Sequence, residues 1–183
     1  MALTKVLTGG ITDSAVTSAK ISAVDVSKLS GLHSAWVMSP QISSPGSATG
    51  LMEWAKDAES TTDNLELGTD VTISSGIISF PSTGLYKMTV DMQGRQGSSS
   101  VTYVGFTWEH SSDSGGSYST VWRRLTNSIS GGYFAFTSDF YYNVTDTSGQ
   151  RLKALHYATA LSGLVIDGGQ GYTSTRLYVT KVS

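Results

Sequence analysis

The chain has 183 residues, and its formal net charge of −2 comes from 12 basic and 14 acidic side chains. The basic residues are dispersed, whereas a nucleic-acid-binding protein would carry a basic stripe, so we expect no nucleic-acid partner. Cysteine is absent, which excludes disulfides, thiol catalysis and thiolate metal sites.

Residues 1–31 place an apolar residue at every fifth position, at Val6, Ile11, Val16, Ile21 and Val26. In a helix this spacing scatters the apolar groups around the circumference, and in a strand it sends successive groups to opposite faces. The segment can bury these side chains only by winding against other chains or by docking on a larger partner. We therefore predict an extended assembly arm that ends at Gly31.

The N-terminal sequence MALTKVLTGG lacks the basic start and apolar core of a signal peptide. No apolar run approaches the roughly 20 residues of a membrane helix. These two observations predict a soluble protein made in the cytoplasm, without classical export and without membrane insertion.

From residue 32 to residue 183 the sequence predicts one domain made of short strands. Runs of β-branched and aromatic residues recur between Gly/Ser-rich turns. Gly76 is expected to form a turn or bulge within its run, and 151–161 suits a helix by spacing but a strand by setting. The predicted strands cover 35–42, 51–55, 71–80, 85–92, 101–109, 120–125, 133–144, 151–161 and 176–182.

The clearest strand pattern lies in 85–92, where Tyr86, Met88, Val90 and Met92 share one face. No long amphipathic helix and no helical crossover interrupts the strands. About eight to ten short strands joined by polar turns predict an all-β fold, an antiparallel sandwich or jelly roll.

Two stretches carry a family resemblance. The segment ISFPSTGLY at 78–86 resembles complement 1q heads and tumour-necrosis-factor-like domains, in which Pro81 and Gly84 shape a turn and Tyr86 enters the core. The segment STRLYV at 174–179 resembles the family's closing strand, whereas Met88 stands where the family usually has an aromatic residue. The resemblance implies a jelly roll that forms a homotrimer around a threefold axis through its inner sheet.

The arm carries a second resemblance, since ITDSAVTSAKI at 11–21 is similar to segments of bacteriophage tail-fibre and virion appendage proteins. Together the two resemblances imply a non-enzymatic virion protein, namely a trimeric fibre, knob or capsid-decoration protein. The arm would bind other virion proteins, and the head would be displayed on the virion surface for host attachment.

Other motifs favour structural interpretations. In Asp113-Ser114-Gly115-Gly116, the serine could act as a nucleophile only beside a histidine base. None of the segments around the histidines resembles such a partner, so we expect a loop turn. The acidic residues of 53–70 lack the spacing of a calcium loop, and the glycines of 168–171 precede a strand rather than a helix. We therefore expect no catalytic residue, no metal and no cofactor.

Four aromatic residues in or beside loops are candidates for receptor binding, because aromatic rings stack on sugars and anchor protein partners. The alternative for each ring is ordinary packing in the core or in the trimer. The candidates are Tyr118, Trp122, Tyr133 and Tyr172.

Two further functions stay open. A carbohydrate- or receptor-binding adhesin domain would carry a specific pocket in the head, and its ligand would be a host surface glycan or protein. A polysaccharide depolymerase would need a pair of catalytic carboxylates, and no such pair stands out in the sequence.

Overall fold

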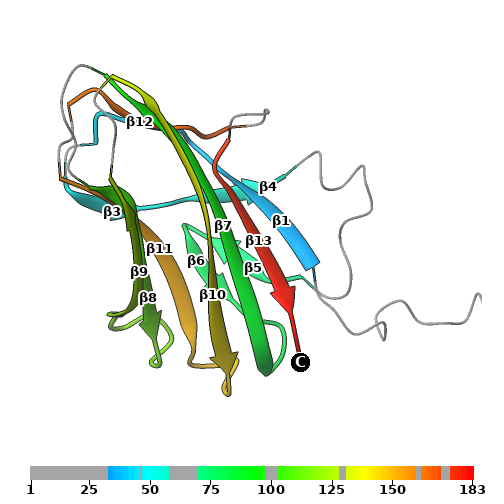
Figure 1. Ribbon diagram of the computed structural model, residues 1–183. Coiled ribbons are helices and arrows are strands. Elements are labelled where there is room, and N and C mark those ends of the chain that lie inside the picture. The colour runs from blue at the N-terminus through cyan, green and yellow to red at the C-terminus, as the bar shows by residue number, and fades with distance from the viewer. Residues whose placement is uncertain are drawn as a thin grey trace, which may run out of the picture.

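The computed structural model describes residues 33–45, 47–57, 70–97, 103–127, 131–159, 162–169 and 174–183. Within these residues the chain forms thirteen strands in two antiparallel sheets that face each other, and it forms no helix (Figure 1). The predicted all-β sandwich is confirmed.

The first sheet, sheet A, has the strand order β2-β12-β7-β13-β1-β4, and β10 is also paired with β7. Its strands are β1 (His33–Met38), β2 (Ile42–Ser43), β4 (Trp54–Lys56), β7 (Gly84–Gln96), β10 (Tyr133–Val144), β12 (Leu164–Ile166) and β13 (Arg176–Lys181).

The second sheet, sheet B, has the order β5-β6-β11-β8-β9, and β3 is also paired with β11. Its strands are β3 (Thr49–Leu51), β5 (Thr72–Ser74), β6 (Ile77–Ser79), β8 (Val104–Ser111), β9 (Ser119–Thr126) and β11 (Arg151–Ala158).

Strand β7 organises sheet A, because it is the longest strand and is paired along both edges. On one edge β10 follows it in continuous register from Tyr133 opposite Arg95 to Val144 opposite Gly84. On the other edge β13 covers the first half of β7, and β12 covers its last residues. Strands β9 and β10 each have one pairing partner among the described residues, so they form edges of the two sheets.

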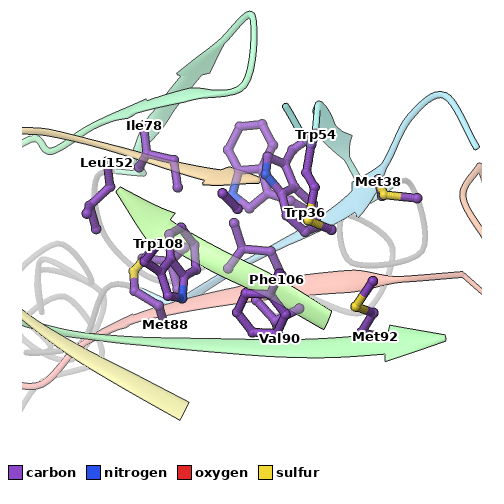
Figure 2. Close-up of a cluster of buried hydrophobic side chains, with 14 of the residues drawn as sticks. Trp36, Met38, Trp54, Ile78, Met88, Val90, Met92, Phe106, Trp108 and Leu152 are labelled. Atoms are coloured by element: carbon purple, nitrogen blue, oxygen red, sulfur yellow. The ribbon is translucent and has the colours of Figure 1, made fainter. Parts of the chain in front are cut away.

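The hydrophobic core lies between the sheets (Figure 2). The predicted face of β7 is fully buried, since Tyr86, Met88, Val90 and Met92 are each 0 % exposed. Phe106 and Trp108 of β8 face them from sheet B, with their rings edge to face at 6.1 Å. Two-residue alternation on both sheets therefore produces one continuous apolar layer.

The turn before β7 has the structure that its sequence predicts. The Tyr86 hydroxyl donates a hydrogen bond to the carbonyl oxygen of Ser82 at 2.9 Å, which ties the turn to the buried ring. Gly84 has a φ of 139°, and a Cβ there would lie 2.0 Å from the carbonyl oxygen of Ser183. Glycine is required at this position, because Ser183 packs directly against it.

Several predicted strand boundaries need correction. The range 71–80 divides into β5 and β6 at Gly76, whose φ of 72° confirms the expected turn. The range 35–42 divides into β1 and β2 around Pro40, and 51–55 divides into β3 and β4. In the ambiguous range 151–161, strand β11 covers Arg151–Ala158, and the three residues of β12 were not predicted. These divisions and β12 raise the count above the predicted eight to ten.

Truncation of Met88 tests this apolar layer, because this side chain points towards Trp108 of the facing sheet (Figure 2). We expect Met88→Ala to lower the free energy of unfolding by about 2–5 kcal/mol, measured by chemical denaturation. The control Val121→Ala removes an apolar side chain that is 43 % exposed on β9, and it should change stability by less than about 0.5 kcal/mol. Equal effects of the two changes would contradict the packing described.

Candidate binding surfaces

A groove of about 390 Å³ lies where β7 ends and β10 begins. Gln93 and Arg95 alternate along β7 with the buried Met92, so their side chains lie on the outward face of sheet A. We call this hollow the β7–β10 groove. Its lining residues are Gln93, Gly94, Arg95, Tyr133, Phe134, Ala135 and Asp167.

An ion pair forms one side of the groove. Arg95 Nη1 lies 2.6 Å from Asp167 Oδ1, and the side chains are 45 % and 9 % exposed. The backbone of Asp167 is fixed on both sides, because its N–H donates to Gln93 and its carbonyl accepts from Thr175, both at 2.9 Å. The buried carboxylate therefore holds the guanidinium in place while leaving part of it accessible.

Tyr133 forms the opposite side of the groove. It is 76 % exposed, and it lies directly opposite Arg95 in the register of β10 and β7. Ala135 also lines the groove on the same face of the sheet, opposite Gln93, and its small side chain leaves space beside the tyrosine ring. The groove thus combines an exposed aromatic ring with an anchored pair of opposite charges.

A second surface lies between the two edge strands, β9 and β10. Trp122 of β9 and Phe136 and Phe140 of β10 point inward but are only partly buried. Phe136 stacks on Phe106 at 6.1 Å, Phe140 stacks on Trp108 at 6.0 Å, and the rings of Trp122 and Phe140 are also 6.0 Å apart. We call these three residues the aromatic edge, since core aromatics continue there to the molecular surface.

The outward face of sheet A carries polar cross-strand contacts below the groove. Lys87 Nζ lies 2.9 Å from Asp139 Oδ2, and the Thr89 hydroxyl donates to Asp139 Oδ1 at 2.6 Å. Hydrogen bonds from Thr89 and Lys87 lower the pKa of Asp139. Beyond this ladder Tyr141 is 55 % exposed, and Tyr178 stacks on His33 with ring centroids 6.2 Å apart.

The segment 112–118 forms a hydrogen-bonded turn between β8 and β9. The Asp113 carboxylate accepts from the hydroxyl of Ser111 at 2.6 Å and from the backbone and hydroxyl of Ser117 at 2.9 and 2.8 Å. These bonds, led by that of Ser111, lower the pKa of Asp113 to about 2. Ser114 has a φ of 61°, and its hydroxyl donates to the Ser148 carbonyl, as expected of a turn residue.

The candidate Tyr118 follows this turn. The ammonium group of Lys153 lies 3.8 Å from the centroid of its ring, so a cation–π contact covers one face. Its hydroxyl is buried without a hydrogen-bond partner, and burial raises its pKa. The ring is therefore engaged with β11, and a ligand role for it stays a prediction.

The structure places the four aromatic candidates at separate positions. Trp122 belongs to the aromatic edge, Tyr133 to the β7–β10 groove and Tyr118 to the 112–118 turn. Tyr172 lies outside the described residues, as does the whole predicted arm with Val6, Ile11, Val16, Ile21 and Val26. The division into 1–31 and 32–183 stays a prediction.

Sequence reasoning missed Arg95 and Asp167. These residues are 72 positions apart and lie on strand ends with no motif between them, so only the pairing of β12 with β7 brings them together. The available signal for this site was Tyr133, an aromatic residue at the start of the predicted strand 133–144.

Two acidic residues of the 53–70 region, Asp57 and Asp70, take part in ion pairs. Asp57 Oδ2 accepts from Arg176 Nε at 2.9 Å, and Asp70 pairs with Lys56. Across the described ranges, no three histidine or acidic side chains lie together in a group that could hold a metal ion. The same ranges contain no helix long and apolar enough to cross a membrane.

No family model and no curated protein matches the chain. Solved structures with the same fold define its class, an antiparallel jelly roll similar to tumour-necrosis-factor-like proteins. Murine APRIL at pH 8.0 is 15 % identical with a TM-score of 0.56, over 83 % of this chain and 99 % of that one. Eiger TNF from S. frugiperda is 12 % identical with a TM-score of 0.55, over 84 % and 94 %. At these identities the similarity shows the fold alone, which confirms the predicted jelly roll.

His156 of β11 is a buried titratable group outside both surfaces. It is 4 % exposed and lies opposite Gly50 of β3, where a Cβ would approach its Cε1 to 2.4 Å. Its Nδ1 has no hydrogen-bond partner, and burial lowers its pKa. Protonation therefore favours the unfolded chain, because there the imidazolium is hydrated.

Acid denaturation should separate the contributions of His156 and Asp113, whose pKa values are both lowered. The unfolded chain takes up a proton at His156 as the pH falls below 6.5, so stability should decline from that point. Asp113 stabilises the fold above its ordinary pKa of 3.8, and this contribution should be lost as the pH falls towards 2. Urea denaturation between pH 8 and pH 2 measures this dependence of stability on pH. His156→Gln should reduce the loss of stability below pH 6.5. Asp113→Asn should reduce the loss of stability between pH 3.8 and pH 2. The same profile in both variants would contradict these assignments.

Proposed function

We propose that the protein is a non-enzymatic virion structural protein: a trimeric fibre, knob or capsid-decoration protein of a bacteriophage. The residues 1–31 anchor it to other virion proteins, and the jelly-roll head is displayed on the virion surface for host attachment. The pentad spacing of the arm supports the anchoring role, and the jelly-roll fold supports a head that binds other molecules.

The aromatic edge is the observation that carries the homotrimer. A monomer would leave Trp122, Phe136 and Phe140 partly in water along the open side of the sandwich. Burial of such rings is worth about 25 cal/mol per Å² of apolar surface, and interface cores are enriched in aromatic residues. A second copy that covers this edge would complete the core, so self-association explains the pattern.

The outward face of sheet A is the surface that would receive this edge. Tyr141 and Tyr178 offer amphipathic rings there, next to the polar ladder of β7 and β10. Contact between an edge and a face is heterologous, and three copies close such a contact into a ring. Tyr141 lies opposite Lys87 in the register of β10 and β7, and Tyr133 lies opposite Arg95. The groove at Arg95 is therefore roughly 26 Å along β7 from Tyr141, away from the proposed contact.

The oligomeric state is the direct test of this proposal. Light scattering on the purified chain at micromolar concentration should give three times the 19.4 kDa mass of one chain. A monomeric mass would overturn the trimer.

Substitution on β9 tests the role of the aromatic edge. Trp122→Gln should shift the mass towards that of a monomer, because it places an amide where the edge would be buried. Val121→Gln is the matched control, since the neighbouring side chain points to the other face of the strand and is 43 % exposed. Circular dichroism checks that both variants are folded. A trimeric mass for folded Trp122→Gln would show that the interface lies elsewhere.

Removal of the arm tests the anchoring role. A chain that begins at Leu32 should remain folded and trimeric, because the arm has too few apolar residues to contribute to the core of the head. It should fail to join particles that lack this protein, whereas the full chain joins them. A much lower melting temperature of the shortened chain would instead place the arm in the core.

The β7–β10 groove favours a second candidate function, a carbohydrate- or receptor-binding adhesin domain. This function is compatible with the first, because a virion head can also bind a ligand. A glycan array probed with the full chain separates a purely structural head from an adhesin.

A further inference from the structure

We propose that the β7–β10 groove binds a neutral saccharide through two neighbouring hydroxyl groups. The proposal rests on the attachment role suggested above and names the ligand class for it. The groove is open, has about 390 Å³ of space and unites one exposed ring with three hydrogen-bonding side chains. These properties match one sugar ring better than an apolar ligand.

Tyr133 supplies the apolar contact. Its ring is 76 % exposed, so it is not needed to complete the core of the described domain. A pyranose has one face lined by C–H groups, and this face packs on an aromatic ring that carries a negative quadrupole. Ala135 beside it leaves space for the sugar, because a larger side chain there would fill the floor.

The pair formed by Arg95 and Asp167 supplies the polar contacts. Arg95 has five N–H donors, and its described contact with Asp167 uses Nη1 and Oδ1. The guanidinium belongs to a side chain that is 45 % exposed, so it can donate to two adjacent sugar hydroxyls, and one of these can in turn donate to the exposed part of the carboxylate. Gln93 adds an amide on the same face of β7.

Charge selects against an acidic sugar. The carboxylate of Asp167 lies 2.6 Å from the guanidinium, so the pair is neutral in sum. A uronic acid or a phosphate would gain from Arg95 but would meet the Asp167 carboxylate at short range, where like charges repel. The net charge of −2 on the chain also disfavours anionic ligands.

The site is preorganised, which lowers the cost of binding. The Asp167 backbone is hydrogen-bonded to β7 and to Thr175, and the Thr175 hydroxyl accepts from the Gln93 N–H at 3.1 Å. The buried Asp167 in turn fixes Arg95. Binding therefore has to order few side chains.

Saturation-transfer difference NMR on the full chain tests the proposal with defined probes. These are the methyl glycosides of glucose, galactose and mannose, with glucuronic acid as the charged counterpart. We expect at least one neutral glycoside to give a signal and glucuronic acid to give a weaker one. Tyr133→Ala and Asp167→Asn should each weaken the affinity at least tenfold.

Two further variants keep the test independent of damage to the fold. Ala135→Leu fills the floor of the groove without removing a polar group, and it should also abolish the signal. Tyr103→Ala removes another exposed tyrosine, beside sheet B, and should bind like the unmodified chain. Circular dichroism on every variant confirms folding.

No signal with any neutral glycoside, or an equal signal in Ala135→Leu and the unmodified chain, would overturn the proposal. A stronger signal with glucuronic acid would overturn the neutral class. Light scattering on the same samples separates the two proposals. If a monomer binds a saccharide, the groove proposal is supported and the trimer proposal is wrong. If a trimer binds no glycoside, the trimer proposal is supported and the groove proposal is wrong.

Discussion

The double-sided pairing of β7 is the constraint on which the rest of the structure depends. Its thirteen residues contact β10 on one edge and β13 followed by β12 on the other, and these partners come from distant parts of the chain. A one-residue shift in this register would turn Met88 and Val90 from the core to the outward face. The buried side chains of β7 therefore fix the partners as well as the core.

The same register builds the groove. Gly94 faces the core at the point where β10 and β12 both approach β7, and a Cβ there would lie 2.4 Å from Phe134 Cζ and 2.3 Å from the Val165 carbonyl oxygen. Only glycine allows this approach. The neighbours of Gly94 along β7, Gln93 and Arg95, are thereby brought beside the strand ends that carry Tyr133 and Asp167.

The sequence predicted the elements whose pattern is local. The alternation in 85–92 and 133–144 identified β7 and β10, and Gly76 identified a turn, because each signal depends on neighbouring residues. Strand β12 has three residues, which is too short for a period to be visible. The groove joins Arg95 to Asp167 through sheet pairing, and the openness of the aromatic edge depends on where the sheet ends. Neither property can be predicted from one segment of the sequence. Tyr133 could be predicted as a binding candidate, because it is an aromatic residue beside a loop.

The proposed assembly contact and the proposed ligand site lie on different parts of the same sandwich. In the proposed trimer a second copy would cover the partly buried rings of the aromatic edge, and Tyr141 and Tyr178 on the outward face of sheet A would meet that edge. The groove lies at the other end of β7, where Arg95 and Asp167 of one chain form their ion pair. Three copies in a ring would carry three grooves, and a surface with repeated saccharides would engage them together. Multivalent binding of this kind would raise avidity by roughly 10²–10⁴ over a single site, so a shallow groove would suffice for the proposed attachment.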